Sequence, residues 1–252
     1  ELHIVISGSS LLQINDGHSD LSRRLTEYQM SGLSFREFMC MMTGVNIEPI
    51  ELSSLLNSPN LFCQEVKRHF HPLEYFHLYL KEGYYPFYFE NNKMYHNVIE
   101  NVINYIVDNE LTMFRGLEVG NSRRIKALLQ ILSKMVPYEV DISKLSRTIG
   151  IQRPTTLKYL KNLEEAALIR RLFTKIDTIT DLQKPDKILI DNSNILYTLS
   201  DSNPEIGTVR ETFFCNQLCA AGHIVEYGGL KTGDFRIDKE IVIEVGGSDK
   251  GL

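Results

Sequence analysis

The feature that most constrains this chain is a long amphipathic stripe that begins at Ser122. Apolar residues follow it with the spacing i, i+3, i+4, i+7 and i+10, at Ile125, Leu128, Leu129, Leu132 and Met135. This period places them on one face of a helix, and such a face must be buried against other elements. The stripe therefore predicts a core-facing helix at the start of a small helical domain.

The residues after this stripe predict two short helices joined by a tight turn. Asp141 is suited to cap a helix that runs to Ile149 and ends at Gly150. Pro154 suits the first turn of a second helix that runs to about Ala167. A small core is supplied by Leu145, Ile149, Leu157, Leu160, Leu163 and Leu168. The pattern is that of a winged helix-turn-helix over residues 121–175.

The second of these helices is the predicted DNA-contacting element. Its outer side is expected to carry Thr155, Thr156, Lys158, Tyr159 and Asn162, whose side chains suit phosphates and base edges. The predicted contacts to double-stranded DNA are Arg153, Thr155, Thr156, Lys158, Tyr159, Lys161, Arg170 and Arg171.

Charge supports this prediction locally. Residues 141–175 hold eight Lys or Arg and three acids, a balance of +5, whereas the whole chain carries −5. Basic residues gathered in one module of an acidic protein are the expected footprint of phosphate contact. The alternative is a helix-turn-helix used for protein contact or internal packing, with a basic face that is only solvated.

The last stretch, 176–252, has the pattern of a small α/β domain. Strands are predicted at Lys187–Ile190, Asp234–Ile237 and Ile241–Val245, with a helix over Thr208–Ala221. Cys215 and Cys219 lie one turn apart on that helix, where buried thiols on an apolar face are favoured over half of a metal site.

Three carboxylates in this stretch suggest a metal site. Asp234 and Glu244 lie on the two neighbouring strands, and Glu211 lies on the preceding helix. They resemble the D…E-x-K arrangement of restriction-endonuclease-like nucleases, in which the acids hold Mg²⁺. Gly246 occupies the position of the lysine, which points to a degenerate nuclease. The alternative is a structural role for Asp234 and Glu244 at turns and strand ends.

The N-terminal half divides into two segments with different sequence patterns. Residues 1–57 begin with a strand-like run, His3–Ser7, and continue to a helical pattern over Leu33–Met42. Residues 58–120 alternate amphipathic helical segments with aromatic loops, with a break at residues 84–87.

A family resemblance connects these segments. A strand that ends in Ser7-Gly8-Ser9-Ser10, then Leu21, Ser22 and Arg24, then SFREF at residues 34–38 is similar to the archaeal and bacterial AAA-like P-loop ATPases with a C-terminal domain of unknown function. Arg23 stands where that family has glycine. The resemblance continues into GTVRETFFCNQL, GDFRI and IVIEVGG, and so covers nearly the whole chain.

The resemblance implies a mixed α/β fold in four parts. These are the end of a P-loop α/β domain (1–57), a helical lid (58–120), the winged helix-turn-helix (121–175) and a nuclease-like α/β domain (176–252). It also implies that Ser9 or Ser10 senses the γ-phosphate of ATP and that Arg24 contacts nucleotide charge, although a surface ion pair is an equal alternative for Arg24.

The phosphate-binding loop itself is missing from these residues. The sequence has no G-x-x-x-x-G-K-[ST], so this chain by itself is not expected to hydrolyse ATP. ATP and Mg²⁺ are expected as cofactors of a longer protein with an N-terminal ATPase half, and a further Mg²⁺ as the ligand of the nuclease-like carboxylates.

The composition excludes several classes of protein. With 43% hydrophobic and 23% charged residues and no apolar run of about 20, the chain is expected to be a cytoplasmic protein without a membrane partner. Four cysteines exclude a disulfide scaffold. His69, His71 and His77 lie in an aromatic, amphipathic setting, which favours packing over metal binding. The sequence therefore predicts a regulatory, DNA-contacting part of an ATPase, with a Mg²⁺-dependent nuclease or an interaction and homo-oligomerisation module as alternatives.

Overall fold

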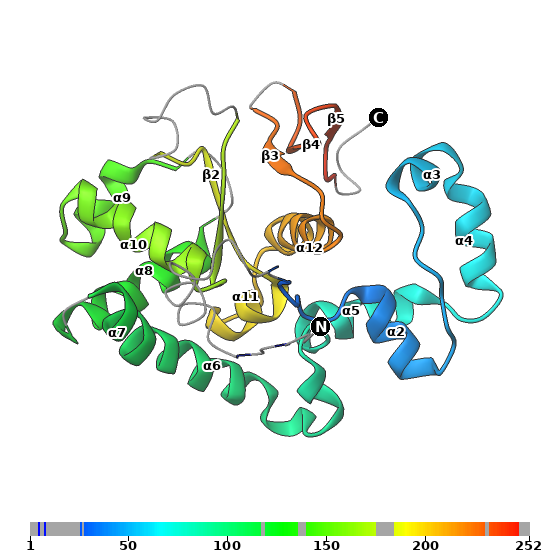
Figure 1. Ribbon diagram of the computed structural model, residues 1–252, viewed down its shortest axis with the longest axis horizontal. Helices are drawn as coiled ribbons and strands as arrows, with labels where there is room; N and C mark the ends of the chain where they lie inside the picture. The colour runs from blue at the N-terminus through cyan, green and yellow to red at the C-terminus, as the bar shows by residue number, and fades with distance from the viewer. Residues whose placement is uncertain are drawn as a thin grey trace, which may run out of the picture. The chain divides into compact units, whose positions relative to one another are not determined.

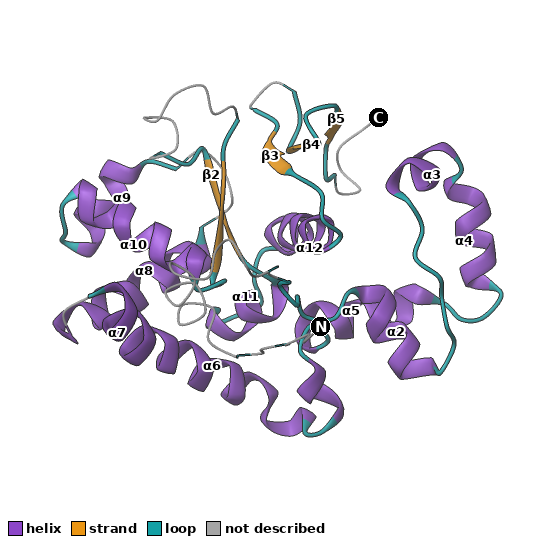
Figure 2. Ribbon diagram, viewed as in Figure 1, coloured by secondary structure: helices purple, strands orange, loops and turns teal. Residues whose placement is uncertain are grey.

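The computed structural model describes residues 28–116, 119–135, 140–174, 184–229 and 232–246, together with three isolated positions nearer the N-terminus. The fold is mixed α/β, mostly helical with small antiparallel sheets (Figures 1 and 2). The chain forms two compact units, one over Met30–His96 and one that contains the described residues from Asn97 onward. The division falls near the start of helix α6, and the unit Met30–His96 runs across the expected boundary at residue 57.

The first unit is helical. It contains α2 (Phe35–Thr43), α3 (Leu52–Asn57), α4 (Pro59–Lys67) and α5 (Pro72–Glu82), followed by 3₁₀ turns at Pro86–Phe89 and Asn92–Met94. Ser34 caps α2: its hydroxyl accepts from the backbone of Glu37, whose carboxylate accepts from the backbone of Ser34 in return.

Aromatic side chains form the core of the first unit. Phe38 and Tyr79 are almost fully buried, and their ring centroids lie 5.5 Å apart. Tyr79 donates its hydroxyl hydrogen to the carbonyl of Leu33 at 2.7 Å. A Cβ at Gly83 would lie 2.6 Å from the Tyr79 Cα, so glycine is required where α5 ends against this core.

The second unit begins within α6 (Tyr95–Tyr105), which continues through a π-helical turn (Ile106–Glu110) into α7 (Leu111–Arg115). A 3₁₀ turn (Val119–Asn121) leads into α8 (Ser122–Lys134), then α9 (Ile142–Ile149) and α10 (Arg153–Glu165). The predicted stripe of α8 is confirmed, since Ile125, Leu128, Leu129 and Leu132 are all buried.

The predicted turn between α9 and α10 is confirmed in detail. The Asp141 carboxylate accepts from the Lys144 backbone at 3.0 Å and so caps α9. Gly150 ends α9 with φ +67°, the left-handed conformation that glycine adopts without a steric cost. Pro154 lies in the first turn of α10.

A hairpin follows these helices. Strands β1 (Ile169–Leu172) and β2 (Lys187–Ile190) pair antiparallel, with Ile169 opposite Ile190 and Leu172 opposite Lys187. The expected domain boundary at residue 175 lies between the two paired strands, because β1 was not foreseen. The Val140 amide donates to the Asp186 carbonyl at 3.2 Å and adds the segment before α9 to this edge.

The C-terminal elements pack on the hairpin. They are α11 (Ser193–Leu199), α12 (Ile206–Ala220) and the antiparallel strands β3 (Val225–Tyr227), β4 (Phe235–Ile237) and β5 (Ile241–Ile243). The Tyr227 amide donates to the Phe173 carbonyl at 3.0 Å, which links β3 to the end of β1. The hairpin thus lies between the α9–α10 pair and α12 (Figure 1).

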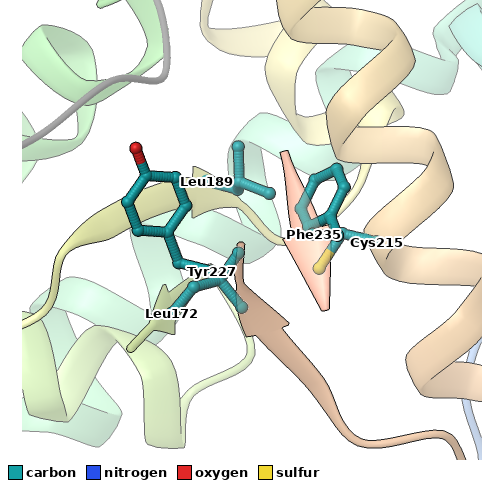
Figure 3. Close-up of a cluster of buried hydrophobic side chains, with 5 residues drawn as sticks. All are labelled: Leu172, Leu189, Cys215, Tyr227 and Phe235. Carbon is teal, nitrogen blue, oxygen red and sulfur yellow. The ribbon is translucent and has the colours of Figure 1, made fainter. Parts of the chain in front are cut away.

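A single apolar cluster joins the hairpin, α12 and the second sheet. Figure 3 shows its buried members, which are Leu172, Leu189, Cys215, Tyr227 and Phe235. The two small sheets therefore share one core. In the part of the chain that the structure describes, no helix is long and apolar enough to cross a bilayer.

Candidate functional site

Helix α10 carries the predicted DNA contacts, but the structure divides them between two faces. Arg153, Lys158 and Lys161 are exposed and Thr155 is half-buried. Thr156, Tyr159 and Asn162, expected on the outer side, are instead buried at 0%, 2% and 3% exposure. The expectation for these three is wrong because the helical period turns positions 156, 159 and 163 toward the core together, and position 162 is buried beside Leu163.

The buried threonine has a clear structural role. The hydroxyl groups of Thr156 and Ser146 share a hydrogen bond of 2.8 Å, and Thr156 also donates to the Gln152 carbonyl. These contacts tie α10 to α9 at the turn. A buried hydroxyl that is already bonded in this way is not available to a nucleic acid.

Two of the arginines that are predicted to contact DNA form ion pairs with carboxylates. Arg171 places Nε and Nη2 at 2.7 Å and 2.6 Å from Glu164 Oε2, and its backbone amide donates to the same carboxylate. Arg170 Nη2 lies 3.0 Å from Asp191 Oδ1. Both guanidinium groups are mostly covered, so they hold β1 to its neighbours rather than extend the basic surface.

The basic surface that remains borders two hollows. The first, of about 450 Å³, is lined at the helix turn by Gly150 and Gln152, with Arg147 from α9, Thr155 from α10 and Arg124 from α8. Arg124 was missed in the sequence because the charge count began at residue 141. Its signal is the Arg123-Arg124 pair at the start of the amphipathic stripe.

The second hollow, of about 580 Å³, lies between the start of α9 and the base of the hairpin. Lys144, Arg153 and Lys184 line it, together with Asp141 and Asp186. Asp141 is engaged as the cap of α9, and Asp186 accepts from Thr174 at 2.8 Å. Both carboxylates are therefore occupied within the protein, while the three cations face the hollow.

The predicted nuclease carboxylates Glu211, Asp234 and Glu244 do not line either hollow. Glu211 forms an ion pair with Lys187, which is 2% exposed and lies beneath the rings of Tyr227 and Phe235. Asp234 accepts from the Val245 amide at 2.8 Å, and the register of β4 and β5 places it opposite Glu244. Among the described residues no three His, Cys, Asp or Glu side chains form a group able to hold a metal ion. Glu211 is thus engaged with Lys187, and the Mg²⁺ site at Asp234 and Glu244 stays a prediction.

A buried polar cluster lies between β1, β2 and α12. Burial raises the pKa of Asp191, an effect that Arg170 opposes. Asn216 on α12 donates to the Asp191 carbonyl at 3.1 Å. Beside them, a hydrogen bond from Cys215 lowers the pKa of Cys219 to about 7, with Arg170 acting in the same direction and burial against it.

Comparison with known proteins identifies one family. Residues 73–205, just over half of the chain, match the family described as domain of unknown function DUF8612. The chain belongs to this family. No curated protein and no solved structure matches it.

The DUF8612 match runs from α5 to the residues before α12. It includes α8, α9, α10 and the β1–β2 hairpin, and hence every residue that lines the two hollows. Glu211, Asp234 and Glu244 lie beyond its end. The predicted nucleotide-sensing residues Ser9, Ser10 and Arg24 lie outside the described residues. The basic hollows are thus the candidate site that falls within the DUF8612 region.

Proposed function

We propose that this chain binds double-stranded DNA through the exposed basic side of α9 and α10. The proposal rests on the arrangement of α8, α9 and α10 followed by the β1–β2 hairpin, with Val140 hydrogen-bonded to the hairpin edge. This is the order of elements in a winged helix, in which the second helix of the pair enters the major groove. Here that helix is α10.

Charge on this side supports the proposal. Lys144, Arg147, Arg153 and Lys158 are exposed, and within the described ranges none of the four forms an ion pair. Cations that are not neutralised within the protein are those able to release counterions from DNA phosphates. The paired residues Lys161, Arg170 and Arg171 contribute less, since each already faces a carboxylate.

The resemblance to AAA-like ATPases extends this proposal to a longer protein. There the DNA-contacting unit would be the regulatory C-terminal part of an ATP-driven machine, with ATP and Mg²⁺ bound by the upstream half. The two hollows would then be contact points whose affinity depends on the nucleotide state. Metal-dependent cleavage remains a prediction of the sequence alone.

The test is fluorescence anisotropy of a short labelled duplex titrated with the protein at low and moderate salt. Binding should weaken with salt, and Lys158→Glu should lower the slope of log K against log salt by about one unit. Lys67→Glu, an exposed site on α4 with the same change of charge, is the matched control and should bind as the parent does.

Two outcomes would count against the proposal. One is no binding at low salt, which favours a protein-interaction or oligomerisation module. The other is an equal loss of affinity in Lys158→Glu and Lys67→Glu, which would mean that net charge rather than the α10 surface determines binding.

A further inference from the structure

The first hollow is lined by two arginines from different helices, Arg124 of α8 and Arg147 of α9. Both side chains are exposed, so the hollow opens to solvent. In the part of the chain that the structure describes, no Asp or Glu lines it, whereas two carboxylates line the second hollow. Its volume of about 450 Å³ lies within the range of small-ligand sites, about 300–1,000 Å³. The first hollow is therefore suited to an anion.

Arg124 is oriented without being neutralised. Its Nη1 donates to the side-chain oxygen of Asn121 at 3.3 Å, and Asn121 lines the same hollow. The residues of α8 that pair with carboxylates in the described chain are Lys126 and Lys134. An amide oxygen accepts a hydrogen bond but carries no net charge. Arg124 therefore keeps its positive charge and several N–H donors for a ligand.

The start of α10 adds a hydroxyl group to the hollow. Thr155 is half-buried there, and its hydroxyl forms no hydrogen bond within the described residues. The hydroxyls of Ser146 and Thr156, by contrast, bond to each other. The first turn of this 13-residue helix also carries a partial positive charge, which acts in the same direction as the two arginines.

We propose that the first hollow binds a phosphate group through Arg124, Arg147 and the hydroxyl of Thr155. A guanidinium group presents its donors in a planar fork that matches two phosphate oxygens. The phosphate belongs either to the backbone of a duplex or to a free phosphate compound. As a backbone site the hollow rests on the proposed DNA binding, and it extends the contact surface from α9 and α10 to α8. As a site for free phosphate it stands without that function.

The experiment compares Arg124→Gln with Arg123→Gln in the whole chain. Arg123 is the matched control, because it is exposed on the same helix but does not line the hollow. In duplex titrations by fluorescence anisotropy, Arg124→Gln should lower the slope of log K against log salt by about one unit, and Arg123→Gln should leave it unchanged. In thermal unfolding, pyrophosphate should raise the Tm of the parent and of Arg123→Gln above the value in sodium chloride of equal ionic strength, but not that of Arg124→Gln.

The two readouts separate the sources of the phosphate. A specific loss in the duplex titration supports a backbone phosphate. A specific loss in the pyrophosphate experiment alone, with no duplex binding by the parent, supports a free phosphate compound and ends the DNA proposal. Equal behaviour of Arg124→Gln and Arg123→Gln in both experiments overturns the phosphate site, even where the parent binds duplex.

Two further variants test the geometry of the site. Arg147→Gln should repeat the effect of Arg124→Gln, and the double variant should lose less than the sum of both, because the two guanidinium groups hold one phosphate. Additive losses would contradict a shared phosphate. Arg124→Lys keeps the charge but lacks the fork, so it should restore the salt slope and only part of the affinity. Circular dichroism checks that each variant is folded.

Discussion

At the scale of single residues, Glu211, which the sequence predicts as a catalytic residue, forms a buried ion pair with Lys187. Lys187 is 2% exposed on β2 and is covered by the rings of Tyr227 and Phe235. An ammonium group loses its hydration at such a site and needs a counter-charge. Glu211 supplies this charge from α12. The carboxylate thus neutralises a buried cation and links α12 to the hairpin.

A substitution of one partner should therefore lower the free energy of unfolding strongly, whereas substitution of both partners should lower it much less. Glu211→Gln is expected to lower the free energy of unfolding by about 3–5 kcal/mol, because Lys187 is left buried without a counter-charge. The double variant Lys187→Met/Glu211→Leu should recover most of the loss, since apolar groups of similar size suit the site. Urea unfolding of the parent, both single variants and the double variant measures the coupling. Additive losses would contradict the pairing.

At the scale of elements, the helices α8 to α10 and strand β2 could be predicted, whereas strand β1 and its pairing with β2 could not. The helical period, Asp141 and Gly150 carry local signals, and α8, α9 and α10 follow them closely. Strand β1 has only four residues, two of them arginines, and pairs with a strand beyond a long connection. The polar character of Thr156 and Tyr159 predicted an outward position for both. That prediction failed because the rotation of a helix about its axis depends on which neighbours it packs against.

The same elements separate two arginines that look alike in the sequence. Arg153, at the start of α10, is exposed beside a hollow, whereas Arg171 of β1 is held by Glu164. Arg153→Gln should weaken duplex binding and lower the salt slope by about one unit, with little change in stability. Arg171→Gln should lower stability with a smaller effect on binding. Anisotropy titrations and urea curves on both variants make the comparison, and a reversed ranking would show that the ion pair opens on DNA.

At the scale of the whole molecule, the chain has two separate cores. Phe38 and Tyr79 lie at the centre of the unit over Met30–His96, and Leu128 and Leu160 lie in the unit that follows. The basic residues of α9 and α10 belong to the second unit, in a chain whose net charge is −5. Because each core is built from its own unit, damage to one is expected to leave the proposed DNA-binding surface of the other intact.

Matched truncations of the two cores make this expectation measurable. Phe38→Ala should cost about 3–5 kcal/mol and Leu128→Ala about 2–5 kcal/mol, because both side chains are fully buried. Hydrogen exchange should show lost protection in α2 and α5 for Phe38→Ala, and in α8 to α10 for Leu128→Ala. Only Leu128→Ala should weaken duplex binding, since α8 packs against α9 and α9 packs against α10. If Phe38→Ala lowers protection of α8 to the same extent, the two units unfold as one, and a substitution in either unit then acts on DNA binding through stability alone.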